Sequence, residues 1–382
     1  MQRRNFTTVS GHVSSSYAPQ LESPVGAISK KSKLLAFSSM LSLLAALLVS
    51  INTGGQELET GGTLRSAAQA QRFLVGAAAE LKPLETDPAY AQTLAREYNA
   101  LTAANAMKFE PLRPTRSRFA FADADKILDF TTAHGMKLRG HTLVWHNQLP
   151  RWLVDGNFSS DEVSAILREH IETVMGHYRG RVYAWDVVNE AIDDQGGLRQ
   201  TFWSNMLGSD YIAQAFTLAR AADPQATLLY NDYGGEALGV KSEAIYGLLK
   251  ALKGRGVPID GIGLQSHFLL EEPPRMSEVA ANIRRLAALG LEIQITELDV
   301  RMFMPPNEKK LQDQAQIYRA YLDACLVVTN CNTFVTWGFT DKYSWIPRFL
   351  PGNGAALPFD QAYRQKPAYH ALLQALNNSH RR

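Results

Sequence analysis

Residues 182–190 read VYAWDVVNE, a short apolar run that ends in an amide, Asn189, and a carboxylate, Glu190. Its apolar and aromatic positions do not alternate strictly with polar ones: Val182, Ala184, Trp185, Val187 and Val188. A strand without such alternation is typical of a parallel sheet that is buried on both faces. The stretch therefore predicts an internal strand with polar groups at its carboxyl end.

Other stretches of the same kind occur along the chain: RFLVGAAA, ALTAANAM, KLRGHTLVW, ATLLYNDY, GIGLQSHF, EIQITELDV and TFVTWGF. Amphipathic, helix-like runs lie between most of them, near residues 88–99, 123–134, 161–178, 241–255, 277–289, 308–328 and 367–376. This alternation predicts an α/β fold, a single closed (β/α)8 TIM barrel. A doubly wound open sheet is the alternative, and it is disfavoured because no GxGxxG or GxxxxGK phosphate loop follows any strand.

The front of the chain predicts export. Residues 34–51 are mostly apolar and follow three lysines, so residues 1–51 are expected to be a signal peptide or signal anchor. Residues 52–70 are Gly-rich and polar, as in a linker, and the barrel is expected to span residues 71–378. We expect a secreted or periplasmic protein after cleavage, with retention in the membrane by residues 34–51 as the alternative.

The composition limits the partners. With 39 basic and 37 acidic residues, the net charge of +2 gives no reason to expect nucleic acid. No protein partner is indicated, and we expect a monomer. The chain has two cysteines, Cys325 and Cys331, which are too few for a Cys–Cys–His metal cluster. They are either buried thiols or, in an oxidising compartment, a short-range disulfide.

Polar and aromatic side chains gather at the ends of six predicted strands: Asn105 and Lys108, His141 and Trp145, Asn189 and Glu190, Gln265 and His267, Glu297, and Trp337. In a barrel these strand ends meet at one mouth, where active sites are built. Two carboxylates there suit glycoside hydrolysis, in which one donates a proton and the other stays ionised. Aromatic rings beside them suit sugars.

Each of these residues has a simpler explanation when taken alone. A glutamate at a strand end can be the favourable charge at a helix start, and a lone histidine is often an ordinary hydrogen-bonded residue. A metal site is disfavoured because His141 and His146 have odd separation, which would put them on opposite faces of a strand. His141 instead shares a face with Trp145, as Gln265 does with His267. We expect no metal and no other cofactor.

With these residues in view, the sequence resembles the family 10 glycoside hydrolases, the barrel-type endo-β-1,4-xylanases, over roughly residues 72–375. The motifs occur in the order of that family: GHTLVWHNQLP, WDVVNEA, YNDY, GIGLQSH, ITELDV and TWGFTDKYSW. The resemblance implies a retaining endo-1,4-β-xylanase that acts on xylan or xylo-oligosaccharides. A β-1,4-glucanase or cellobiohydrolase-type activity on the same barrel is the alternative.

The resemblance also implies roles for single residues. Glu190 matches the general acid/base and Glu297 the nucleophile. Asn189 matches the amide that bonds the hydroxyl next to the reacting carbon, His267 the histidine bonded to the nucleophile, and Gln265 its neighbour in the cleft. Residues at sugar-binding and other cleft positions are Asn105, Lys108, His141, Trp145, Gln148, Asn231, Tyr233, Trp337 and Trp345. The cysteine spacing resembles that of the local disulfide of the family.

One motif departs from the family. The usual reading on the second strand is ENEMKW or ENAMKW, whereas this chain has Ala104 in place of the first glutamate and Phe109 in place of the tryptophan. That glutamate normally accepts a hydrogen bond from the sugar two places from the cleavage point. A charge-assisted hydrogen bond contributes about 1.5–3 kcal/mol. The departure therefore predicts a weaker hold on this sugar with the catalytic pair intact.

Overall fold

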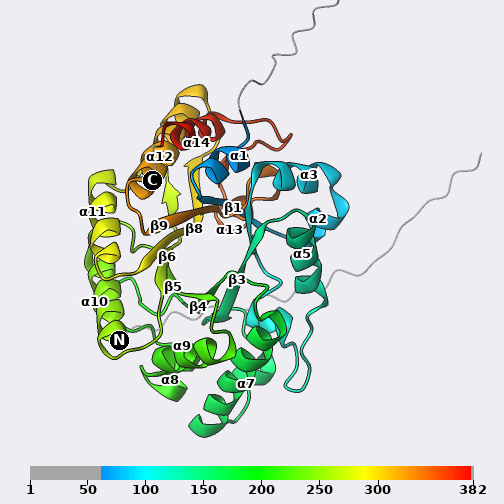
Figure 1. Ribbon diagram of the computed structural model, residues 1–382, viewed down its shortest axis with the longest axis vertical. Coiled ribbons are helices and arrows are strands. Elements are labelled where there is room, and N and C mark those ends of the chain that lie inside the picture. The colour runs from blue at the N-terminus through cyan, green and yellow to red at the C-terminus, as the bar shows by residue number, and fades with distance from the viewer. Residues whose placement is uncertain (1–61, 380–382) are drawn as a thin grey trace, which may run out of the picture. The chain divides into compact units, whose positions relative to one another are not determined.

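The computed structural model describes residues 62–379, so the predicted signal segment 1–51 and residues 52–61 of the predicted linker lie outside the described part. Eight parallel strands run in chain order, and the last pairs with the first (Figure 1). They are β1 (Leu74–Ala79), β2 (Ala100–Ala103), β3 (Lys137–Val144), β4 (Ala184–Asn189), β5 (Thr227–Asp232), β6 (Gly261–Leu264), β8 (Glu292–Phe303) and β9 (Cys331–Thr336). This closed ring confirms the predicted barrel.

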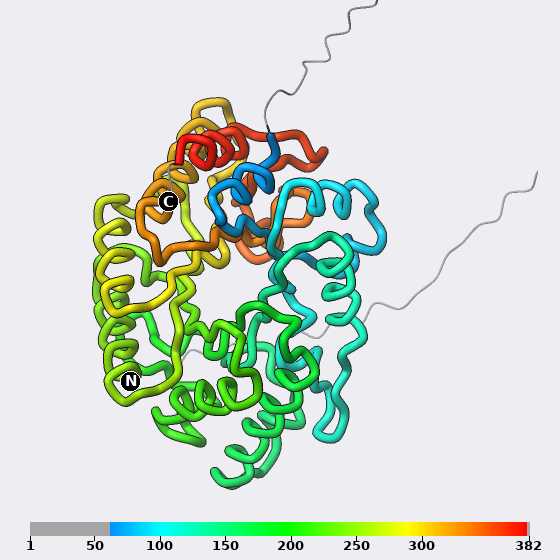
Figure 2. The backbone as a smooth tube through the Cα atoms, in the orientation of Figure 1, coloured from blue at the N-terminus to red at the C-terminus, as the bar shows by residue number. Residues whose placement is uncertain are grey.

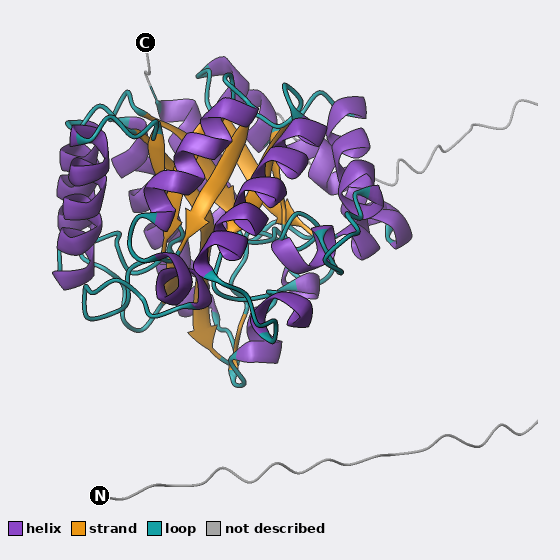
Figure 3. Cartoon of the chain, turned by 90° about the horizontal axis from the view of Figure 1, so that it is seen from below, coloured by secondary structure: helices purple, strands orange, loops and turns teal. Residues whose placement is uncertain are grey.

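Within residues 62–379, eight longer helices form the outer layer. Figure 3 shows the helices, in purple, around the strands, in orange. They are α3 (Pro88–Glu97), α5 (Ala122–Ala133), α7 (Ser160–Tyr178), α9 (Tyr211–Ala222), α10 (Val240–Gly254), α11 (Met276–Ala287), α12 (Glu308–Leu326) and α14 (Pro367–Asn378). The sequence pattern missed α9. Its buried residues are spread around much of the helix and Arg220 is its one charged residue, so no charged face marks it out in the sequence.

Shorter elements lie near the ends of the barrel. They are α1 (Leu64–Ala70), α2 (Leu81–Thr86), α4 (Phe109–Leu112), α6 (Arg151–Val154), α8 (Phe202–Leu207), α13 (Ile346–Phe349), the 3-10 turn Asp341–Tyr343, β7 (His267–Leu269) and β10 (Asn353–Gly354). Both extra strands pair with β8, whose long carboxyl end extends beyond the barrel wall. Of these short elements, β7, the 3-10 turn and α13 contribute residues to the cleft described below.

The linker prediction is wrong for its last residues, because α1 belongs to the folded domain. Thr63 caps this helix by accepting a hydrogen bond from the backbone N–H of Ser66. Leu64, Ala67 and Ala68 share one face and are buried. In Figure 2 the helix, in blue, lies beside α14, in red, and the two helices are in contact. The polar and glycine-rich composition of the stretch concealed this short apolar face.

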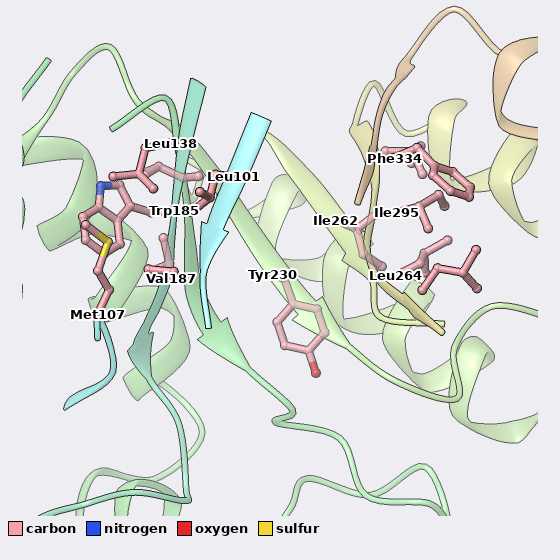
Figure 4. Packing of buried hydrophobic residues seen from close by; sticks show 14 of the residues in the cluster. Leu101, Met107, Leu138, Trp185, Val187, Tyr230, Ile262, Leu264, Ile295 and Phe334 are labelled. Atoms are coloured by element: carbon pink, nitrogen blue, oxygen red, sulfur yellow. The ribbon is translucent and has the colours of Figure 1, made fainter. Parts of the chain in front are cut away.

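The strand β4 shows how the barrel wall is packed. Trp185 is fully buried on the outer face, with its ring centroid 6.0 Å from that of Tyr178 in α7. Figure 4 shows Trp185 grouped with Leu138 and other apolar side chains. Asp186 faces the interior instead, where it accepts a 2.8 Å hydrogen bond from Arg139. Both faces are buried, as predicted, but the inner face holds paired polar groups as well as apolar ones.

A disulfide joins Cys325 near the end of α12 to Cys331 at the start of β9. Both side chains are fully buried. Of the two alternatives that the sequence left open, the structure therefore has the short-range disulfide. No helix between residues 62 and 379 is both long and apolar enough to cross a membrane.

Candidate active site

A cleft of about 1310 Å³ opens where the barrel strands end. The predicted site residues that line it are Asn105, Lys108, His141, Trp145, Gln148, Asn189, Glu190, Tyr233, Gln265, His267, Glu297, Trp337 and Trp345. Asn231 lies beneath the floor of the cleft, where it bonds one of the glutamates. The topology thus brings side chains from seven strand ends and the loop after β9 into one site.

The backbone fixes the position of Glu190. This residue follows β4 directly and has a φ of 58°, in the left-handed region that is uncommon for residues other than glycine. Its N–H donates to the carbonyl of Asn231 at 2.8 Å, and its carbonyl accepts from Nε of Arg199 at 2.8 Å. Backbone strain of this kind persists only where surrounding contacts hold it. The sharp turn directs the side chain into the cleft.

The carboxylate of Glu190 is held on both oxygens. Trp145 donates its indole N–H to Oε2 at 2.8 Å, while Gln265 donates to Oε1 at 3.0 Å. Asn189 also donates to Oε1, at 3.2 Å. The side chain remains 12% exposed to the cleft. A carboxyl group so oriented, with access to the cavity, can exchange a proton with a bound molecule.

Glu297 on β8 is the more buried carboxylate. Its Oε1 accepts a hydrogen bond from Asn231 at 2.8 Å, and its Oε2 lies 3.3 Å from Nε2 of His267. Burial by itself raises the pKa of this carboxyl, but the hydrogen bond from His267 and the nearby charge of His141 outweigh it and lower the pKa. Glu297 is therefore kept ionised, as a nucleophile requires.

An aspartate orients the histidine beside Glu297. His267 Nδ1 lies 2.9 Å from Oδ2 of Asp299, and the same oxygen accepts from the indole N–H of Trp345 at 2.9 Å. Burial opposes the charged imidazolium, but Asp299 and Glu297 raise the pKa of His267 well above its usual range. Asp299 was not among the predicted site residues. Its position two residues after Glu297 on the same strand was a usable signal.

The prediction that His141 and His146 lie on opposite faces of a strand is wrong. His146 does not face away from the site, because its Nδ1 lies 3.9 Å from Oε2 of Glu190, just as His141 lies 3.9 Å from Glu297. The alternation rule fails because β3 ends at Val144, so the two histidines do not share one regular strand. Among residues 62–379, no group of three or more His, Cys, Asp or Glu side chains could hold a metal ion.

Lys108 and two indole rings form the wall near β2. The Lys108 ammonium lies 4.9 Å from the ring centroid of Trp145 and 5.9 Å from that of Trp337. Burial lowers the pKa of Lys108, while three carboxylates, those of Glu297, Glu80 and Glu190, act in the opposite direction. The wall thus offers flat aromatic faces with a charged hydrogen-bond donor between them, which suits the faces and hydroxyls of sugars.

Loops contribute cleft residues that sequence patterns did not reveal. Arg199, between β4 and α8, supports a cleft residue from behind, since its Nη2 donates to the hydroxyl of Tyr233 at 3.0 Å. Glu236 lies after β5, lines the cleft and accepts from the backbone N–H of Ser266 at 2.7 Å. Glu80 follows β1 and also lines the cleft. Loop residues of this kind carry no periodicity, so only the folded chain shows their place.

A parallel β/α barrel that brings an oriented, accessible carboxyl and a buried, ionised carboxylate into an aromatic cleft defines a glycoside hydrolase. Comparison with known proteins agrees with this class. Residues 63–375 match the profile of glycosyl hydrolase family 10. An endo-1,4-beta-xylanase of Agaricus bisporus is 39% identical over 328 residues, which cover 86% of this chain and 96% of that protein.

Two further comparisons lead to the same family. Endo-1,4-beta-xylanase B of Thermotoga neapolitana is 43% identical over 288 residues, 75% of this chain and 83% of that protein. The crystal structure of xylanase 10B from Thermotoga petrophila RKU-1 in complex with xylobiose has a TM-score of 0.81 and 41% identity, covering 82% of this chain and 97% of that one. The chain belongs to glycosyl hydrolase family 10. The predicted family and enzyme class are confirmed.

Proposed function

We propose that this chain is a retaining endo-1,4-β-xylanase that hydrolyses internal bonds of xylan by double displacement. The observation that carries the proposal is the link between the two glutamates. Asn231 donates to Oε1 of Glu297 and to the side-chain oxygen of Asn189, both at 2.8 Å. Asn189 in turn donates to Glu190. Both carboxylates are thus fixed in one hydrogen-bond network at the cleft floor. The choice of xylan as substrate is supported by the relatives, which are named as xylanases.

The mechanism assigns one role to each carboxyl group. Glu190 gives its proton to the leaving oxygen while the carboxylate of Glu297 attacks the anomeric carbon, so the glycosidic bond breaks as a glycosyl–enzyme ester forms. Glu190 then takes a proton from water, which attacks the same carbon and releases Glu297. His267 and Asn231 stabilise the negative charge of the Glu297 carboxylate before it attacks the sugar and after the glycosyl–enzyme ester is hydrolysed. The anomeric configuration is retained.

The substrate is tested by activity. The alternative function is a β-1,4-glucanase that uses the same two glutamates, so the two substrates to compare are xylan and a soluble cellulose derivative. We expect many more reducing ends to be released from xylan. NMR of the first product should show the retained anomer. Preference for the cellulose derivative, or an inverted product, would reject the proposal.

At Ala104 the cleft lacks the carboxylate of the family motif, and we propose that the sugar-binding subsite at that position is weakened.

Replacing each glutamate should give a different kinetic result. Glu297→Ala should abolish turnover because no nucleophile remains. Glu190→Ala should lower kcat strongly on xylan but much less on an aryl xylobioside with a good leaving group, which needs little protonation. The measurement is kcat/KM for both substrates. Equal loss on the two substrates in Glu190→Ala would contradict the acid/base role.

We propose that the protein is exported with cleavage of its front segment and acts as a monomer. The support is the apolar stretch of residues 34–51 after three lysines. Mass spectrometry of the protein from the culture medium or periplasm should find a chain that begins after residue 51. A full-length chain recovered only with membranes would favour the anchored alternative.

A further inference from the structure

Glu80 is a cleft carboxylate that the mechanism does not use. It follows β1 and begins the short helix α2, but its side chain makes no capping hydrogen bond to that helix. Its Oε1 instead accepts a 2.5 Å hydrogen bond from Nδ2 of Asn105. No hydrogen bond to its other oxygen, Oε2, is found among residues 62–379. A half-buried carboxylate with a free oxygen at the cleft surface can accept hydroxyl groups.

Glu80 also sets the orientation of neighbouring sugar-binding residues. The side-chain oxygen of Asn105 accepts from Lys108 Nζ at 2.9 Å and from Gln148 Nε2 at 3.4 Å. Because this oxygen faces two donors, the amide nitrogen must point to an acceptor, and Glu80 is that acceptor. The carboxylate, amide and ammonium thus form one chain along the wall of the cleft, next to Trp337.

The register of the barrel places Glu80 beside the unusual alanine. Ala79 on β1 pairs with Ala103 on β2. Glu80 and Ala104 are the residues that follow this pair, so they occupy equivalent positions at the ends of two adjacent strands. The N–H of Ala104 donates to the carbonyl of Ala79 at 3.0 Å. Both Glu80 and Ala104 line the cleft and a recess of about 30 Å³ at its side. The small methyl group of Ala104 therefore leaves space beside the carboxylate of Glu80.

We propose that Glu80 is a substrate-binding residue that supplies, from the neighbouring strand, the carboxylate missing at position 104. This inference rests on the proposed xylanase function. Glu80 accepts hydrogen bonds from the hydroxyls of the sugar two places from the cleavage point, on the side of Asn105 and Lys108. The hold on this sugar, weakened at Ala104, is recovered in part from Glu80. Glu80 acts both by direct contact and by orienting Asn105.

The test compares an aryl β-xylobioside with an aryl β-xyloside, which differ only by that second sugar. The ratio of their kcat/KM values should fall about 10- to 100-fold in Glu80→Ala, the range expected for one charge-assisted hydrogen bond. The exchange variant Glu80→Ala/Ala104→Glu should regain most of the ratio. Glu85→Ala is the matched control, because Glu85 lies in the same helix but pairs with Lys126 at the surface.

The outcomes are separable. An unchanged ratio in Glu80→Ala, with the wild type active, would overturn this inference alone. A ratio that falls in Glu80→Ala but is not regained in the exchange variant would mean that Glu80 only orients Asn105, and would also overturn it. If the wild type hydrolyses neither aryl glycoside nor xylan, the proposed function fails and this inference fails with it. A fall in Glu85→Ala as large as that in Glu80→Ala would indicate a general disturbance of α2 and would count against the assignment.

Discussion

The catalytic pair shows how single residues in one cavity acquire different properties. Glu297 is 4% exposed and yet has a lowered pKa, because the hydrogen bond from His267 and the electrostatic effects of His141 and His267 outweigh that of burial. His267 keeps that charge because Asp299 stands behind it, 2.9 Å away. Removing any one of these groups should change the pH range in which the nucleophile is ionised, and not only the amount of activity.

His267→Asn tests this electrostatic support. Without the hydrogen bond and charge of His267, burial should raise the pKa of Glu297, so Glu297 should become protonated at higher pH. The acid limb of the kcat/KM profile should therefore move upward by about one pH unit or more, since a hydrogen bond to a charged group is worth about 1.5–3 kcal/mol. The measurement is kcat/KM against pH in the free enzyme.

A surface histidine serves as the control for this experiment. His177 in α7 is 31% exposed, lies 2.8 Å from Asp125 in the outer helix layer and does not line the cleft. His177→Asn should leave the acid limb where it is. If the limb keeps its position in His267→Asn as well, then His267 does not maintain the ionised state of Glu297.

At the residue scale the sequence predicted the site well where the side chain belongs to a strand end. Glu190, Glu297, His267 and Trp145 all lie in the cleft because the barrel gathers the carboxyl ends of its strands. It failed for Glu80 and Glu236, which line the cleft from loops that have no periodic pattern. It also failed for His146, because the rule of alternation was applied beyond the end of β3. Pattern arguments hold only as far as the regular backbone extends.

At the element scale the packing between β3 and β4 depends on one glycine. Gly140 pairs in register with Trp185, and a Cβ atom built on Gly140 would lie 2.2 Å from the indole ring. Trp185 is fully buried between the strand and α7, so the ring has little room to move. The absence of a side chain at residue 140 is therefore what allows the large ring to lie flat against the barrel wall.

Gly140→Ala should destabilise the protein, because one added methyl group overpacks this contact. The expected cost is about 1–3 kcal/mol in the free energy of unfolding, measured by urea denaturation. Gly176→Ala is the matched control. Gly176 lies exposed in α7 with no atom within 4 Å of the added Cβ, and alanine there should stabilise the helix by about 0.5–1 kcal/mol. Effects of the same sign at both positions would contradict the packing argument.

Element prediction from sequence depended on the contrast between faces. The helices near residues 161–178 and 308–328 were found because apolar residues recur at helical spacing beside charged ones, and the structure has α7 and α12 there. The helix α9 was missed because alanines and apolar residues surround it on most sides. The eight strands were found from short apolar runs, whereas the short β7 and β10 have too few residues to form a pattern.

At the scale of the whole molecule, α1 links the start of the described chain to its end. The carboxylate of Glu97 in α3 accepts from the backbone N–H of Leu64 at 3.3 Å and from the hydroxyl of Tyr369 in α14 at 2.8 Å. Arg65 donates to the carbonyl of Ala95 at 2.8 Å. The helices α1 and α3 thus meet the distant helix α14 at one buried carboxylate, and the domain includes residues that composition assigned to a linker.

Leu64→Ala in the full chain measures how much α1 contributes to the stability of the domain. Leu64 is fully buried, so its truncation should cost about 2–5 kcal/mol in the free energy of unfolding, through lost burial and the cavity left behind. The same change at Leu238, which is 41% exposed, should stay within about 0.5 kcal/mol. Urea denaturation followed by tryptophan fluorescence measures both. If the two variants unfold alike, the burial of Leu64 in α1 contributes little to the stability of the domain. If only Leu64→Ala unfolds early, any cleavage that yields a stable enzyme must occur before residue 63.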